Sequence, residues 1–136
     1  MTETDAAYLA GLFDGEGSVY YKRTKQIRHN RPGKPVHNIW VIRMEIAMTE
    51  KSIINWVHEF TGVGHSGPRK VKPGKKKQWR WRCSHRDAYY VSRVIWPYAH
   101  VKLPKIHKII EHYSGEKVMN GNVVDLEKYR EVMSLE

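Results

Sequence analysis

Two acidic residues, Asp14 and Glu16, stand at the end of a short apolar segment that is typical of a helix. A helix C-terminus carries partial negative charge, so an acid placed there costs roughly 0.3–1 kcal/mol. A bound cation would offset that repulsion. Carboxylate oxygens suit Mg²⁺, which keeps several waters and accepts phosphate oxygens as further ligands. The two acids therefore predict a divalent-metal site, and an exposed turn acid is the alternative for Glu16.

The segment before these acids is predicted to form a helix that ends at about Asp14. Thr4 or Asp5 can cap its start, because both side chains accept a hydrogen bond from the first turn. The helix would place three apolar side chains on one face, at the i, i+3 and i+4 spacing of a core contact: Leu9, Leu12 and Phe13.

The opposite face of this predicted helix is made almost entirely of small residues: Ala7, Ala10, Gly11 and Asp14. Glycine inside a helix costs about 1 kcal/mol relative to alanine, so Gly11 indicates a close approach by another helix. The chain offers no second helix with a matching small face. We therefore expect a two-fold dimer in which this face meets its own copy.

The remaining elements follow from alternation and from turn residues. Residues 36–48 alternate with period 2, with Ile42 and Met44 on one face and Arg43 and Glu45 on the other, which is typical of a sheet with one buried face. The other predicted strands cover 18–28, 66–72 and 78–84, and the other predicted helices cover 49–61, 87–96, 104–119 and 125–135. This order predicts an α+β fold in a single domain, 1–136, in which 114–136 has no assigned role.

The positive charge is the strongest global feature of the chain. The formal net charge is +10, and residues 64–86 hold nine Lys or Arg and no acid. A second basic block covers residues 17–49, so both blocks coincide with predicted strand pairs. Basic charge gathered on one surface is typical of proteins that bind a polyanion such as a nucleic acid. Solvated basic loops are the alternative.

Composition excludes several classes of protein. No apolar run approaches the roughly 20 residues that a membrane span needs, and the acidic N-terminus is unlike a signal or transit peptide. Cys83 is the only cysteine, so an internal disulfide and a cysteine-based zinc cluster are excluded. We expect an intracellular, soluble protein, and its phage, bacterial or organellar origin stays open.

The nine residues 9–17, which read LAGLFDGEG, resemble the motif of the LAGLIDADG homing endonucleases. The resemblance extends to residues 49–51, 62–64 and 97–102 and covers most of 6–113. It implies the αββαββα fold, in which a four-stranded antiparallel DNA-binding sheet is backed by helices. Chains with one motif are homodimers in this family, and their motif helices pack together at the two-fold axis.

The resemblance also implies a set of site residues. The acid at the eighth motif position, Glu16, would coordinate Mg²⁺ or Mn²⁺ beside the scissile phosphates, together with the backbone carbonyl of Gly15. Lys102 would lie near the scissile phosphate as a second catalytic residue, and a solvated lysine is its alternative. Where the family often carries a water-ordering glutamine, this chain has Met48, which departs from the pattern.

The same resemblance places the sheet in the DNA major groove, so residues on its open face are expected to contact DNA. Arginine reads guanine bidentately, and a lone acid such as Glu45 can accept from cytosine, although a cross-strand ion pair is the alternative for Glu45. The expected DNA-binding residues are Ser18, Tyr20, Lys22, Thr24, Gln26, Arg28, Arg43, Glu45, Arg69, Lys70, Lys72, Arg80 and Arg82.

Taken together, these features predict a metal-dependent, homodimeric endonuclease that makes sequence-specific double-strand breaks with 3′ overhangs in a long, partly palindromic DNA target. The alternative is a non-cleaving nucleic-acid binder of the same fold, such as an intron maturase or a transcriptional regulator. Glu16 favours the nuclease, because a pure binder needs no acid at that position. The sequence leaves the target and the gene context, such as a mobile intron, open.

Overall fold

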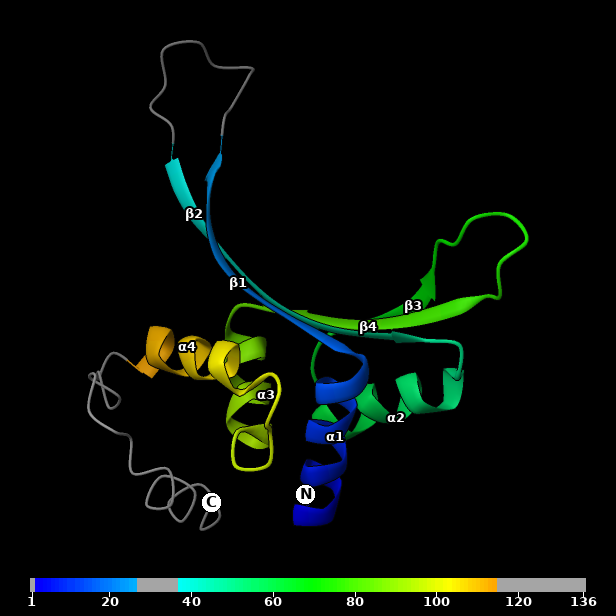
Figure 1. The fold of residues 1–136 in the computed structure, drawn as a ribbon, viewed down its shortest axis with the longest axis horizontal. Helices are drawn as coiled ribbons and strands as arrows, with labels where there is room; N and C mark the ends of the chain where they lie inside the picture. Colours follow the sequence, from blue (N-terminus) through cyan, green and yellow to red (C-terminus); the bar gives the residue numbers. More distant parts are fainter. Residues whose placement is uncertain (1, 27–36, 115–136) are drawn as a thin grey trace.

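The computed structural model describes residues 2–26 and 37–114 of the chain (Figure 1). The elements in chain order are α1 (Glu3–Glu16), β1 (Gly17–Gln26), β2 (His37–Met48), α2 (Lys51–Thr61), β3 (His65–Arg69), β4 (Gln78–Ser84), α3 (Arg86–Ile95) and α4 (Leu103–Ser114). This order confirms the predicted helix, strand pair, helix, strand pair and following helices. The predicted helix at 125–135 lies outside the described residues.

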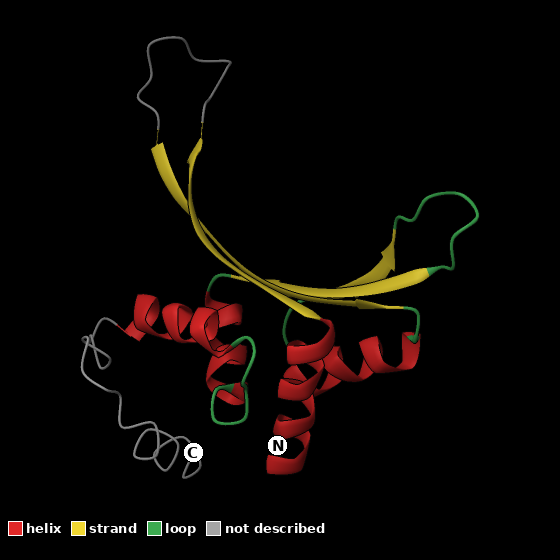
Figure 2. Ribbon diagram, viewed as in Figure 1, coloured by secondary structure: helices red, strands yellow, loops and turns green. Residues whose placement is uncertain are grey.

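The four strands form one antiparallel sheet in the order β1-β2-β4-β3. All four helices cover the same face of this sheet, and the opposite, concave face carries none (Figure 2). The predicted α+β fold, an antiparallel sheet backed by helices, is therefore confirmed. Because no described helix covers the concave face, its side chains are available to contact a partner.

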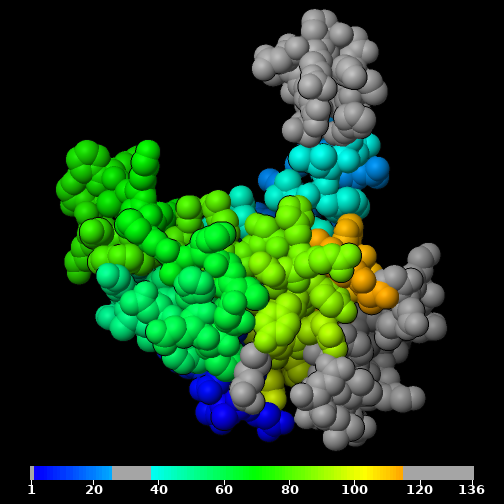
Figure 3. Space-filling view, turned by 180° about the vertical axis from the view of Figure 1, so that it is seen from behind, coloured from blue at the N-terminus to red at the C-terminus, as the bar shows by residue number. Residues whose placement is uncertain are grey.

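The first strand pair extends beyond the rest of the sheet. β1 pairs with β2 along its whole length, from Gly17 to Gln26, but β2 pairs with β4 only from Arg43 to Met48. Residues 21–26 and 37–42 consequently form a two-stranded ribbon, here called the arm, which rises away from the helices (Figure 1). Seen from behind, its cyan surface projects beyond the green body of the molecule (Figure 3).

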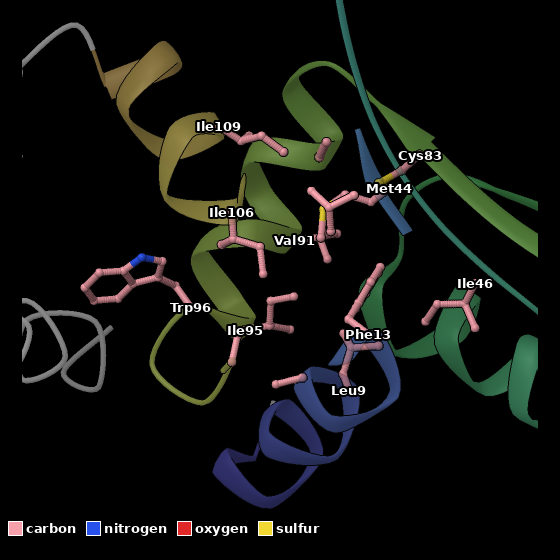
Figure 4. Close-up of a cluster of buried hydrophobic side chains, with 14 of the residues drawn as sticks. Leu9, Phe13, Met44, Ile46, Cys83, Val91, Ile95, Trp96, Ile106 and Ile109 are labelled. Atoms are coloured by element: carbon pink, nitrogen blue, oxygen red, sulfur yellow. The ribbon is translucent and has the colours of Figure 1, made fainter. Parts of the chain in front are cut away.

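The core lies between the sheet and the helices. Ile42, Met44 and Ile46 of β2 are fully or almost fully buried, as the period-2 pattern predicted. Figure 4 shows side chains from α1, β2, β4, α3 and α4 gathered in this layer. Because alternate residues of a strand point to opposite faces, burial of this set directs Arg43 and Glu45 to the concave face.

The bounds of α2 and β3 differ from the prediction. α2 starts at Lys51 rather than Thr49, and it ends as predicted at Gly62, whose positive φ of 69° suits a left-handed helix cap. β3 is only five residues long and stops at Arg69, although alternation predicted a strand to Lys72. The amide of Lys75 donates to the Lys72 carbonyl at 3.1 Å, so a turn begins there before β4.

Among α1 to α4, the helices within the described residues, none has the length and apolar character needed to cross a membrane.

Candidate functional site

The end of α1 presents Glu16 at a tight junction between helix and strand. α1 continues through Glu16, and β1 starts at the next residue, Gly17. A Cβ at Gly17 would lie 2.5 Å from Phe13 Cδ1 and 2.7 Å from Phe13 Cα. Only glycine fits this close approach, so Gly17 allows the sheet to begin immediately after the acid. Glu16 is thus the last helical residue, not a residue beyond the helix end as the sequence suggested.

The start of α1 also differs from the prediction. The side chain of Thr2 accepts the backbone N–H of Asp5 at 3.1 Å, so Thr2 is the cap and the expected cap at Thr4 or Asp5 is wrong. The helix begins at Glu3, because the Thr2 hydroxyl already provides the capping oxygen two residues before Thr4.

Asp14 joins α1 to a segment far away in the sequence. Its Oδ2 accepts the backbone N–H of His100 at 2.9 Å, and its Oδ1 accepts that of Lys102 at 3.0 Å. The sequence assigned Asp14 to a contact with a second copy, whereas both carboxylate oxygens are engaged within this chain. The consequence is that the loop before α4, which carries Lys102, is held against the last turn of α1.

Glu16 and Gly15 form the part of this region that suits a metal ion. Both residues are exposed, and helix geometry leaves the Gly15 carbonyl without an intrahelical donor. The last turn of α1 contains no basic residue, so no cation of that turn offsets its negative end. No three His, Cys, Asp or Glu in the described part of the chain are grouped to hold a metal.

The small face of α1 is only partly available to a partner. Ala10 has no exposed surface because it lies in the core of its own chain, so its predicted place at a dimer interface is wrong. α1 packs against α3 as well as β1 and β2, and this widens its buried side beyond Leu9 and Phe13. The exposed small residues are Ala7, Gly11 and Gly15, which follow one another at four-residue spacing.

The concave face carries the polar residues that the strand alternation predicted. The pairing places Ser18 opposite Glu45, Tyr20 opposite Arg43, and Glu45 opposite Arg82. It also gives the register of β3, because His65 pairs with Arg82 and Gly67 pairs with Arg80. The residues placed on this face are Ser18, Tyr20, Lys22, Thr24, Arg43, Glu45, His65, Arg69, Arg80 and Arg82.

Four predicted DNA-binding residues remain to be placed. Gln26 pairs with His37 at the end of the arm, and Arg28 lies outside the described residues. Lys70 and Lys72 are exposed in the loop after β3 rather than on a strand. The two lysines remain next to the concave face through their sequence position beside Arg69, which donates from Nη1 to Gln78 Oε1 at 3.2 Å.

Glu45 is held by neighbours on both sides. The Tyr20 hydroxyl donates to its Oε1 at 3.1 Å, and Arg82 Nε donates to its Oε2 at 3.2 Å. The ion pair links β2 to β4, which is the alternative that the sequence left open for Glu45. Arg43 completes the group, since its guanidinium lies 4.6 Å from the centre of the Tyr20 ring.

An aromatic cluster at the base of the arm was not foreseen. The rings of Tyr21 and Trp40 lie 4.8 Å apart, and the Tyr21 hydroxyl lies 3.2 Å from Nδ1 of His112 on α4. Burial, followed by the nearby Glu111 carboxylate, raises the pKa of Tyr21. The alternation of β1 and β2 turns both aromatic rings to the helix side, but nothing local in the sequence points to His112.

Met48 fills the position where the sequence comparison expected a polar, water-ordering side chain. It ends β2, pairs with Trp79 of β4, and lies partly buried against the hydrophobic core. It therefore supplies no polar group to the site.

No protein-family model matches the chain, and no curated protein matches it in sequence. Solved structures do match. The homing endonuclease I-CvuI, crystallised with its target and 2 mM Ca, is similar over 96% of this chain and 82% of its own, with a TM-score of 0.62 and 12% identity. The archaeal intron-encoded homing endonuclease I-Vdi141I, complexed with DNA, is similar over 97% and 83%, with a TM-score of 0.60 and 14% identity. The fold is that of the LAGLIDADG homing endonucleases.

The LAGLIDADG fold agrees with the resemblance carried by residues 9–17. A third match, I-CvuI with the I-CreI target and 2 mM Mg, has a TM-score of 0.63 and 14% identity. At such identities the shared property is the fold. On this LAGLIDADG fold the chain has an exposed acid, Glu16, at the end of α1, a Lys102 amide bonded to Asp14 of the same helix, and a concave sheet face that bears arginines.

Proposed function

We propose that two copies of this chain form a sequence-specific, divalent-metal-dependent endonuclease that makes double-strand breaks in DNA inside the cell. The observation that carries the proposal is the position of Glu16. Its exposed carboxylate lies where α1 meets β1, at one end of a helix-free sheet face that bears arginines. An acid at this place has no structural partner in the described chain, and it is suited to hold a metal against DNA phosphate.

The donor atoms fit Mg²⁺ or Mn²⁺. The Glu16 carboxylate and the Gly15 carbonyl offer hard oxygens, and DNA phosphate and water would complete the ligand set. A bound ion supplies stabilisation of the attacking water and of the leaving oxygen during in-line displacement. Two Glu16 side chains near a dimer axis would repel each other without such a cation. Lys102, whose amide is fixed by Asp14, would place its positive charge near the phosphate.

The concave sheet would provide the DNA contacts. β1 has ten residues and spans about 33 Å, close to the roughly 34 Å of one B-DNA turn. A ribbon of this length can follow the major groove. Arg80 and Arg82 lie where base edges would pass, and the exposed lysines 70 and 72 are placed for phosphates, which position a protein without reading sequence.

The dimer would be formed through the exposed stripe of α1. Ala7, Gly11 and Gly15 let a second helix approach closely, and no atom lies within 4 Å of a Cβ built at Gly11 or Gly15. A two-fold dimer presents the same sheet twice, so the target would be long and partly palindromic. Two copies would also bring two Glu16 carboxylates together, one for each DNA strand, with 3′ overhangs as the expected product ends.

The test compares wild type with Glu16→Gln and with Glu59→Gln, which changes an exposed acid of α2 in the same way. Each protein is incubated with a plasmid library and Mg²⁺, and cut sites are sequenced. Wild type and Glu59→Gln should cut at one site. Glu16→Gln should bind that site but cut more than roughly 100-fold more slowly, because losing an outer-shell partner alone costs about 10- to 100-fold.

Three outcomes would contradict parts of this proposal. Binding without cutting by wild type would favour the non-cleaving alternative. A wild type that sediments as a monomer on its target would remove the dimer. An affinity that hardly changes with salt would contradict the proposal that the concave sheet binds DNA. Three phosphate contacts per subunit should give a slope of roughly −5 when the logarithm of the binding constant is plotted against the logarithm of the salt concentration.

A further inference from the structure

Glu45 is an acid on a surface that otherwise suits a polyanion. Within the described strands, every other charged residue placed on the concave face is basic. Its side chain is 18% exposed, so phosphate would approach a carboxylate that is only partly screened. Such a group is costly for DNA binding unless it contributes something in return.

The contacts of Glu45 argue against direct base reading by this acid. Oε1 accepts from Tyr20 on β1, and Oε2 accepts from Arg82 on β4. A carboxylate that reads cytosine must turn toward the N4 amino group in the groove. Glu45 is instead held from both sides, by Tyr20 of β1 and by an ion pair with Arg82 of β4.

Arg82 keeps most of its donors available after this contact. A guanidinium has five N–H donors, and the bond to Glu45 uses the one on Nε. The four donors on the terminal nitrogens remain, and the side chain is 36% exposed. Arg82 borders a hollow of about 450 Å³ whose wall includes His65, Gly67 and Arg80. Gly67 has no side chain to fill that space.

We propose that Glu45 is a positioning residue that holds Arg82 so that its terminal nitrogens read one guanine in each half of the target. The inference rests on the proposed function and adds a base preference to it. A guanidinium fixed through Nε presents two parallel N–H groups, and guanine offers O6 and N7 as the matching acceptor pair. Tyr20 supports the same carboxylate from the other side, so the three residues act as one unit.

The experiment selects preferred DNA sites from a randomised library without added Mg²⁺, so that bound DNA is not cut. The proteins compared are wild type, Glu45→Gln, Arg82→Gln, the double variant and Tyr20→Phe. Arg82→Gln should lower the preference for guanine at one base pair per half-site by roughly 5- to 150-fold. Glu45→Gln should lower it at the same base pair, and the double variant should be no worse than Arg82→Gln.

Tyr20→Phe provides a second, milder variant if Glu45→Gln fails to fold. It keeps the ring under Arg43 and removes only the hydroxyl donor, so the guanine preference should fall less, at the same base pair. Lys22→Gln is the matched control, because Lys22 is an exposed cation of the same face. It should weaken binding to all sites equally and reduce the salt slope by about 0.9 per subunit.

Two results for Glu45→Gln would overturn the inference. In the first, its base preference changes at a different base pair from the one that Arg82→Gln affects. In the second, its base preference is the same as that of wild type. A wild type that selects no sequence at all would instead refute the proposed function, so the two failures are distinguishable.

Discussion

Asp14 offers the sharpest test of how the site is held together. Its carboxylate accepts two backbone N–H groups, from His100 at 2.9 Å and from Lys102 at 3.0 Å. These bonds join α1 to a loop 86 and 88 residues later in the chain. Asp14→Ala removes both hydrogen bonds and adds no new group. The free energy of unfolding should therefore fall by the amount that these two bonds contribute to stability.

The size of the effect follows from the two contacts. A hydrogen bond to a charged group contributes about 1.5–3 kcal/mol. The bond from His100 is exposed and that from Lys102 is partly buried, so water can replace part of the loss. We expect a destabilisation of roughly 2–4 kcal/mol, or about 8–16 °C in Tm. Asp14→Asn keeps one carbonyl acceptor and should lose about half as much.

Urea unfolding at constant protein concentration measures the change, with Glu59→Gln as the control for removal of a surface charge. That control should stay within about 0.5 kcal/mol of wild type. Hydrogen exchange adds a local measurement, since the amides of His100 and Lys102 should exchange faster in Asp14→Ala than in wild type. An Asp14→Ala variant as stable as Glu59→Gln, with both amides still protected, would refute the tether.

Two further predictions concern packing and the buried thiol. Gly17→Ala should lower the free energy of unfolding by about 1–3 kcal/mol, because its Cβ would lie 2.7 Å from Phe13 Cα. Gly67→Ala, whose Cβ meets no atom within 4 Å, should be nearly neutral in the same urea titration. Burial, and then the nearby Asp87, raises the pKa of Cys83 from 9.0 to about 12, so the unfolded chain releases this proton first and stability should fall between pH 9 and pH 12. Cys83 should also resist a thiol reagent at pH 8 until the protein is unfolded; rapid labelling of the native protein would contradict its burial.

Features with a short-range signal could be predicted from the sequence. The alternation of β2 identified which side chains face the helices, because burial of Ile42, Met44 and Ile46 repeats every second residue. Gly62 predicted the end of α2, because glycine readily adopts the left-handed conformation found at helix C-caps. The placement of Arg80 and Arg82 followed from the same alternation in β4, so most of the concave face was foreseen.

Features that depend on distant partners could not be predicted. Asp14 carries no local sign that its acceptor atoms meet amides 86 and 88 residues away. Ala10 is small and was assigned with Gly11 to a helix contact, but only the packing of α3 against α1 shows that it is buried. The strand predicted to Lys72 stops at Arg69, and Val71 beyond it is exposed and lies outside the hydrophobic core.

The arm has a consequence for how this protein could evolve. Its outward residues, such as Thr24, Ile39 and Val41, lie beyond the reach of β4 and outside the buried core. Exposed substitutions away from such packing usually change stability by less than about 0.5 kcal/mol. Mutations at these outward positions of the arm are therefore nearly free of a folding penalty, whereas those in the Tyr20, Glu45 and Arg82 unit disturb bonds between strands. Under selection, new target preferences would arise first at the outer ends of the DNA site, while its inner positions would change slowly and in concert.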